Sequence, residues 1–217
     1  MNICLYVYNS VVVLLLSGFL ISLNPANKSF IKMFLFSLFV QCHVARYSSV
    51  LAWVDNLIGV ISDTHDNVEN VLLAVKIFIK NNVEFVVHCG DVVSPATVRF
   101  FRGLHVKLIK GNCDGDLEQL KVALDEIGGE FLGEVGEIDY DGKRIIAYHG
   151  KDKGKLDQII SGGYDYVLTG HTHKTKDERI GKTRIINPGA HYYNCENKIV
   201  LLDVDNDKVE FIELKKS

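Results

Sequence analysis

Five apolar runs in this sequence each end in side chains that can bind a metal ion. Asp63 and His65 follow the run Leu57–Ile61, Asp91 follows Phe85–Val87, and Asn112 follows Val106–Ile109. His149 follows Ile145–Tyr148, and His171 and His173 follow Tyr166–Thr169. If the runs are parallel strands, their carboxyl ends lie at one edge of a sheet, where sites in open α/β sheets are found. Glycine directly precedes three of these ligands and lets the backbone approach an ion closely. The spacing therefore predicts one shared site.

The segments between these runs have helical patterns. Alternation of short buried strands with helices indicates right-handed βαβ crossovers and a mainly parallel sheet. The pattern predicts a helix over Asn67–Lys80 with Val68, Val71, Leu72, Val75 and Ile79 on its buried face, a helix opened by Ser94 and Pro95, and a helix over Asp116–Ile127 closed by Gly128 and Gly129.

The second half of the chain is richer in strands. It predicts hairpins over Glu134–Tyr140 with Lys143–Tyr148, Glu178–Ile180 with Thr183–Ile186 and Ile199–Val204 with Val209–Leu214, and a helix over Lys155–Ser161. These closing strands suggest a second sheet packed on the first, with helices outside.

Residues 1–56 differ in composition from the rest. They hold 3 of the 24 basic and 1 of the 27 acidic residues, whereas residues 57–217 carry a net charge of -5 (21 basic minus 26 acidic). The apolar stretch from Ile3 to Leu23 is long enough to span a bilayer. We therefore divide the chain into a hydrophobic N-terminal extension, 1–56, and a domain, 57–217.

Three origins of the extension stay open, and one of them is an unusual soluble extension. A start codon assigned too far upstream would produce such a charge-poor leader. Alternatively, the stretch is a membrane anchor, and Lys28, Lys32 and Arg46 after it would keep the domain in the cytoplasm. The five cysteines form no C-x-x-C pair and indicate reduced thiols, so we expect a cytoplasmic protein, anchored to a membrane only if residues 1–56 are translated.

The seven ligand side chains suit a pair of divalent cations. Mixed imidazole, carboxylate and amide ligands favour Mn, Fe, Zn or Ni, and the lack of thiolates argues against a structural zinc site. Two such ions can generate a hydroxide nucleophile and neutralise a phosphate ester, which otherwise repels nucleophiles. The pattern therefore indicates phosphate ester hydrolysis, with Asp91 as the carboxylate that bridges the ions.

In this order, Asp63-x-His65, Gly90-Asp91, Gly111-Asn112-x-Asp114, His149 and Gly170-His171-x-His173 resemble the motifs of the calcineurin-like metallophosphoesterase superfamily. The resemblance covers residues 57–214 and is strongest to the small, cap-less phosphodiesterase-like members of archaea and bacteria. It implies an α/β fold with four layers, an α-β-β-α sandwich of two mixed sheets flanked by helices.

The resemblance also implies ligand sets. One ion would be held by Asp63, His65, Asp91 and His173, and the other by Asp91, Asn112, His149 and His171. A hydroxide that bridges the ions would attack phosphorus in line, with Asp91 and Asn112 as catalytic residues. Manganese is the first expectation for both ions, with Ni, Fe or Zn as alternatives.

One position departs from the family pattern. Many members have His after Gly-Asn, where it assists the leaving group, but this chain has Cys113 followed by Asp114. Leaving groups that need no proton should therefore be favoured, such as those of aryl diesters. We assign Cys113, Asp114 and His191 to substrate binding.

The alternative function is a non-catalytic protein-interaction scaffold on the same fold, as in the retromer subunit. The occupied ligand positions favour the enzyme. The net charge of -3 argues against large nucleic acids and leaves a small phosphate ester as the expected partner. A homo-oligomer is compatible with the sequence.

Overall fold

The computed structural model describes residues 3–8, 11–16, 19–23, 57–192 and 195–215. The chain divides into two units, Met1–Asp55 and Asn56–Ser217. Whether the mature protein contains residues 1–56, and whether they anchor it to a membrane, stays a prediction.

The described part of the first unit is a three-stranded antiparallel sheet. Strands β1 (Ile3–Tyr8), β2 (Val11–Leu16) and β3 (Phe19–Leu23) pair in that order. The described parts of the predicted apolar stretch therefore form strands, and runs such as Val11–Val13 suit strands because β-branched residues favour them. Among the described residues, no helix has the length and apolar character needed to cross a membrane.

The second unit contains a six-stranded mixed sheet in the order β14-β13-β4-β5-β6-β7. Strands β4 to β7 are parallel, while β13 runs antiparallel to β4 and β14 antiparallel to β13. The strands are β4 (Leu57–Ile61), β5 (Phe85–His88), β6 (Val106–Ile109), β7 (Glu130–Gly133), β13 (Lys198–Asp203) and β14 (Lys208–Glu213).

A five-stranded mixed sheet has the order β11-β12-β10-β9-β8. Strand β10 is parallel to both β9 and β12, and the hairpin strands β8 and β11 are antiparallel to their neighbours. The strands are β8 (Val135–Tyr140), β9 (Lys143–Tyr148), β10 (Tyr166–Leu168), β11 (Lys176–Ile180) and β12 (Thr183–Asn187).

The helices of this unit begin at side-chain caps. The described ones are α3 (Val68–Lys80), α4 (Pro95–Arg99), α5 (Leu117–Asp125) and α6 (Lys153–Ser161), capped by Asn67, Ser94, Asp116 and Asp152. In each, the cap side chain accepts a backbone N–H of the first turn, which satisfies a donor that the helix itself leaves unpaired.

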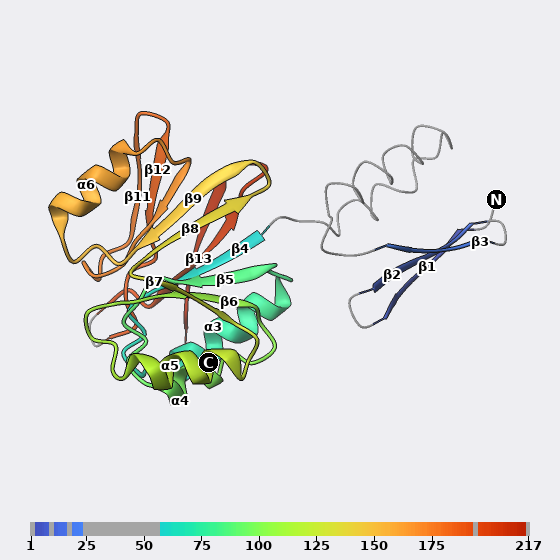
Figure 1. Cartoon of the computed structure of the whole chain (residues 1–217), viewed down its shortest axis with the longest axis horizontal. Coiled ribbons are helices and arrows are strands. Elements are labelled where there is room, and N and C mark those ends of the chain that lie inside the picture. The colour runs from blue at the N-terminus through green and yellow to red at the C-terminus, as the bar shows by residue number, and fades with distance from the viewer. Residues whose placement is uncertain (1–2, 9–10, 17–18, 24–56, 193–194, 216–217) are drawn as a thin grey trace. The chain divides into compact units, whose positions relative to one another are not determined.

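Alternate residues of the strands pack into different layers. In β4, Ile58 and Val60 face the apolar layer between the two sheets, and Ile61 packs with α3 to α5. In β9, Ile145 enters the layer between the sheets, and Ile146 packs under α6. The sheets thus lie face to face with α3 to α5 outside one and α6 outside the other (Figure 1). The four-layer α-β-β-α sandwich is confirmed.

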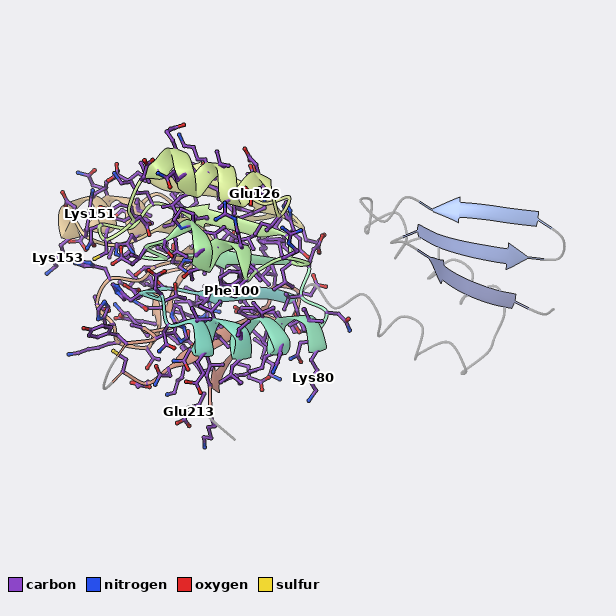
Figure 2. The ribbon with its side chains drawn as sticks, turned by 90° about the horizontal axis from the view of Figure 1, so that it is seen from below. Lys80, Phe100, Glu126, Lys151, Lys153 and Glu213 are labelled. Carbon is purple, nitrogen blue, oxygen red and sulfur yellow. The ribbon has the colours of Figure 1, made fainter. Side chains whose placement is uncertain are left out.

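The buried face of α3 agrees with the predicted one at Val71 and Val75 and differs from it elsewhere. Residues Val71, Ala74, Val75 and Phe78 face the sheet, whereas Val68, Leu72 and Ile79 are 38%, 41% and 52% exposed. In β4, a Cβ at Gly59 would lie 2.7 Å from the Phe78 ring, so the glycine leaves room for that ring to pack against the sheet. Figure 2 shows the three helices across this face, with Lys80 at the end of α3.

Other boundaries shift by a few residues. Helix α5 ends at Asp125 and not at Ile127, α6 begins at Lys153, and β11 begins at Lys176. Strand β7, which follows the Gly128–Gly129 turn, was not predicted, because Glu130–Gly133 is too short and mixed in polarity to give a strand pattern.

Two Val→Ala substitutions, one on each face of α3, test which face of the helix is buried. We expect Val71→Ala to lower the free energy of unfolding by about 2 kcal/mol, because it removes buried methyl groups. Val68→Ala should cost less than about 0.5 kcal/mol, as for an ordinary surface substitution. Urea unfolding followed by circular dichroism measures both. Equal losses would contradict the observed face.

Candidate metal centre

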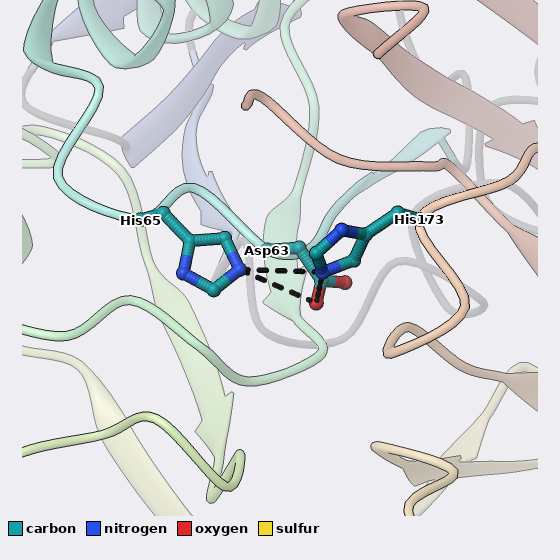
Figure 3. A group of neighbouring side chains, drawn as sticks. All are labelled: Asp63, His65 and His173. Atoms are coloured by element: carbon teal, nitrogen blue, oxygen red, sulfur yellow. Dashed lines mark hydrogen bonds and ion pairs between the residues drawn. The ribbon is translucent and has the colours of Figure 1, made fainter. Parts of the chain in front are cut away.

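Three of the predicted ligands converge at the carboxyl ends of β4 and β10. His173 Nε2 lies 3.3 Å from Asp63 Oδ1, and His65 Nε2 lies 3.9 Å from the same oxygen. The two Nε2 atoms are 3.4 Å apart (Figure 3). Two imidazole nitrogens and a carboxylate oxygen therefore point at one place, although they come from different sheets.

The other predicted ligands surround His149, which follows β9. Its Nε2 lies 3.4 Å from Asp91 Oδ2 and 3.0 Å from Asn112 Oδ1. The ring of His171 lies edge-on to the ring of His149, with centroids 5.2 Å apart. These four residues form a second group of nitrogen and oxygen donors.

Asp91 connects the two groups. Its Oδ2 lies 3.8 Å from His65 Nε2 as well as close to His149. The strand-end loops are also joined by backbone bonds: His65 N–H donates to Asp91 O at 3.1 Å, and Gly170 N–H donates to His149 O at 3.0 Å. The fold thus brings all seven predicted ligands together.

Most of these residues have a left-handed backbone. The φ angles are 51° at Asp63, 42° at His65, 57° at Asp91, 65° at His171 and 59° at His173. For a residue other than glycine this conformation costs about 1–2 kcal/mol, and such strain concentrates at functional sites. The neighbouring Gly111 is equally constrained, since a Cβ there would overlap the Asp91 carboxylate.

The two buried carboxylates differ in their electrostatics. Burial raises the pKa of Asp63, although its Oδ2 accepts bonds from Ser62 Oγ at 2.5 Å and His171 N–H at 3.0 Å. Burial also acts to raise the pKa of Asp91, but hydrogen bonds from His149 and the Cys113 N–H outweigh it and hold that pKa well below its usual range. Asp91 is therefore a buried carboxylate that stays ionised.

His149 is oriented as a metal ligand would be. Its Nδ1 lies 2.8 Å from the carbonyl oxygen of Cys89 and so carries the hydrogen, which leaves Nε2 directed at Asp91 and Asn112. Burial acts to lower the pKa of His149, but its bonds to Asp91 and to the Cys89 carbonyl outweigh burial and raise it. The ionised Asp91 beside Nε2 favours a positive charge there, and the imidazole, carboxylate and amide donors are of the types that bind divalent cations.

Cys113 and Asp114 have different surroundings. Cys113 is an exposed free thiol whose Sγ, a His65 nitrogen and an Asp91 oxygen all lie within 4.8 Å of one another, so it lies at the rim of the centre. Asp114 instead accepts the backbone N–H groups of Gly111 at 2.6 Å and Val93 at 2.9 Å. Its carboxylate fixes the two ligand loops, and we reassign it from substrate binding to positioning.

His191 does not reach the surface. It is 0% exposed, neither ring nitrogen has a hydrogen-bond partner, and burial lowers its pKa to about 3. His88, which the apolar run predicts to be buried, is 1% exposed, and burial lowers its pKa to about 4. The assignment of His191 to substrate binding is therefore not supported, because the side chain is fully buried.

Several positioning residues were missed from the sequence. Ser62 donates to Asp63, and Asp66 accepts the Ser94 hydroxyl at 2.7 Å, which ties the β4 loop to the start of α4. Asn187 donates to Gly170 O at 2.7 Å. Their only sequence signal is that they lie close to the predicted ligands in the chain. Short polar residues also occur commonly in ordinary turns, so that signal does not identify them.

Comparison with known proteins identifies the family. Residues 57–207 match the model of the calcineurin-like phosphoesterase superfamily domain. A phosphodiesterase of Methanocaldococcus jannaschii is 38% identical over 161 residues, which cover 72% of this chain and 97% of that protein. The chain belongs to the calcineurin-like phosphoesterase superfamily.

Other members agree with this assignment. A second protein of M. jannaschii, named a probable metallophosphoesterase, is 30% identical over 158 residues, or 71% of this chain and 78% of that protein. A solved structure described as a novel archaeal phosphodiesterase has 33% identity and a TM-score of 0.70, and the match covers 73% of this chain and 99% of that one. The protein is thus a phosphoesterase of a metal-dependent family, and this part of the sequence prediction is confirmed.

Burial of His191 predicts how stability depends on pH. Its pKa in the folded chain lies below the ordinary 6.5, so as the pH falls below 6.5 the unfolded chain takes up the proton first and stability is lost. His191→Leu removes this uptake and an unsatisfied polar group. Relative to the wild type, we expect the free energy of unfolding of the variant to rise by up to about 1.4 kcal/mol for each pH unit that the pH falls between 6 and 4.

Urea unfolding at a series of pH values measures the effect. Val68→Ala, which truncates an exposed side chain without a titratable group, is the control, and its stability should change with pH as that of the wild type does. Parallel stability curves for His191→Leu and the wild type would contradict the burial of a neutral imidazole.

Proposed function

We propose that the protein is a phosphodiesterase whose centre holds two divalent cations. The observation that carries the proposal is the convergence of two donor groups on one buried carboxylate, that of Asp91. A carboxylate in contact with both groups is the arrangement that a pair of cations requires if they share a ligand.

The ligand sets follow from these neighbours. Asp63, His65, Asp91 and His173 would hold one cation, and Asp91, Asn112, His149 and His171 the other. When bound, the cations supply a hydroxide for in-line attack on phosphorus and neutralise the charge of the phosphate. Manganese is our first choice, because imidazole and oxygen ligands without a thiolate in the set suit it, and Ni, Fe and Zn are alternatives.

The residues of the chain preset this geometry. Ser62 and the His171 N–H hold the Asp63 carboxylate, and the Cys113 N–H holds Asp91 Oδ1 at 2.7 Å. Cys89 O sets the tautomer of His149. Ligands fixed in this way need little rearrangement when cations and substrate bind.

The proposed substrate is a small phosphate diester. The M. jannaschii protein that shares 38% identity is named a phosphodiesterase, and its whole length is nearly covered by this chain. We also propose that the enzyme acts in the cytoplasm, since Cys89, Cys113 and Cys195 are free thiols.

Removal of the shared carboxylate tests the centre. We expect Asp91→Asn to bind less than two equivalents of Mn and to hydrolyse bis-p-nitrophenyl phosphate about 100-fold more slowly or worse, because both ions lose a ligand. The matched control is Asp157→Asn on the exposed surface of α6, which should bind metal and turn over substrate like the wild type. Metal content is measured on the dialysed proteins.

Two outcomes would contradict the proposal. Full activity in Asp91→Asn would show that the carboxylate is not shared between catalytic ions. A wild-type protein that binds no metal and has no turnover with Mn, Ni, Zn or Mg would favour the scaffold alternative.

Cys113, at the rim of the centre, predicts which leaving groups the enzyme prefers. The exposed side chain beside Asn112 is the thiol of Cys113, which is a weak acid at neutral pH and a poor proton donor. We expect p-nitrophenyl diesters to be hydrolysed much faster than dialkyl diesters, with rates that fall as the pKa of the leaving alcohol rises. A series of substituted phenyl diesters measures this slope, and equal rates across aryl and alkyl esters would contradict it.

A further inference from the structure

An exposed aromatic ring stands beside the metal centre. Tyr192 is 59% exposed, the largest exposed fraction among the large apolar side chains described as exposed. Its ring lies 5.7 Å from the ring of His65 at an interplanar angle of 64°. His65 is a proposed metal ligand, so Tyr192 borders the space in which a substrate would bind.

The backbone that leads to Tyr192 is fixed to the ligand loops. His191 N–H donates to Asp63 O at 2.9 Å, and Asn67 Nδ2 donates to His191 O at 2.8 Å. Earlier in the same loop, Asn187 Nδ2 donates to Gly170 O at 2.7 Å. The segments that carry Asp63 and His171 therefore also set the position of the tyrosine.

This arrangement provides an open ring within reach of a bound phosphate ester. Aromatic groups pack with their ring centres about 4.5–7 Å apart, and the His65–Tyr192 separation lies within that range. If the phosphorus atom of a substrate lies next to His65, an ester group attached to it can contact the ring of Tyr192. Because the ring is largely exposed, a planar group can cover it and remove its apolar surface from water.

We propose that Tyr192 forms an aromatic subsite that stacks a planar ester group of the substrate, an aryl or nucleobase substituent. The inference rests on the proposed function, since the phosphate must be held beside His65. It names the class of diester that the enzyme prefers, and it makes Tyr192 a specificity-determining residue.

Two phosphonates that differ in one group test the subsite. Phenylphosphonate and methylphosphonate are titrated by calorimetry into the full chain loaded with Mn. We expect the phenyl compound to bind the wild type about 10-fold more tightly, the size of one stacking contact. Tyr192→Ala should weaken phenylphosphonate to the level of methylphosphonate and leave methylphosphonate unchanged, whereas Tyr192→Phe should keep the preference.

Val122→Ala, which truncates an exposed side chain on α5, is the control and should match the wild type. Equal affinity of both phosphonates for the wild type, or a phenyl preference that survives in Tyr192→Ala, overturns the subsite and leaves the phosphate centre intact. Failure of both phosphonates to bind the Mn-loaded wild type overturns the proposed function and the subsite with it.

Discussion

The burial of the Asp91 carboxylate among hydrogen-bond donors is the constraint on which the rest of the site depends. The side chain is almost fully buried, and a carboxylate in such a place is stable only if positive or donor groups surround it. His149 and the Cys113 N–H supply these groups, and the backbone carbonyl of Asp91 receives the His65 N–H. The loops after β4, β5, β6 and β9 are therefore all arranged around one carboxylate.

The two sheets give this carboxylate its neighbours. Parallel strands β4, β5 and β6 present their carboxyl ends at one edge, and β9 and β10 do the same in the second sheet. The apolar layer between the sheets, which includes Val60 and Ala147, holds those edges together. A well-packed core of this kind can compensate for the left-handed backbone at five of the ligands, whose strain would otherwise distort the loops.

In the proposed centre, chemistry and selectivity would be divided between different residues. The ligands lie on strand ends braced by both sheets, whereas Cys113 and Tyr192 lie exposed at the rim. Under the proposed function, changes at the rim would alter which ester is accepted without disturbing the donor groups. This division is common in enzymes, where a rigid scaffold positions loops that determine specificity.

The sequence by itself predicted the fold class, most of the strands and the seven candidate ligands, although it did not predict strand β7. These predictions were possible because apolar runs followed by Asp, Asn or His are local features that the chain carries in any conformation. The tertiary structure decided which faces are buried: Phe78 packs inward against the space left by Gly59, whereas Leu72 is exposed. It also decided that His191 is enclosed while Tyr192 is exposed, because hydrogen bonds to Asp63 and Asn67, distant in sequence, fix that loop.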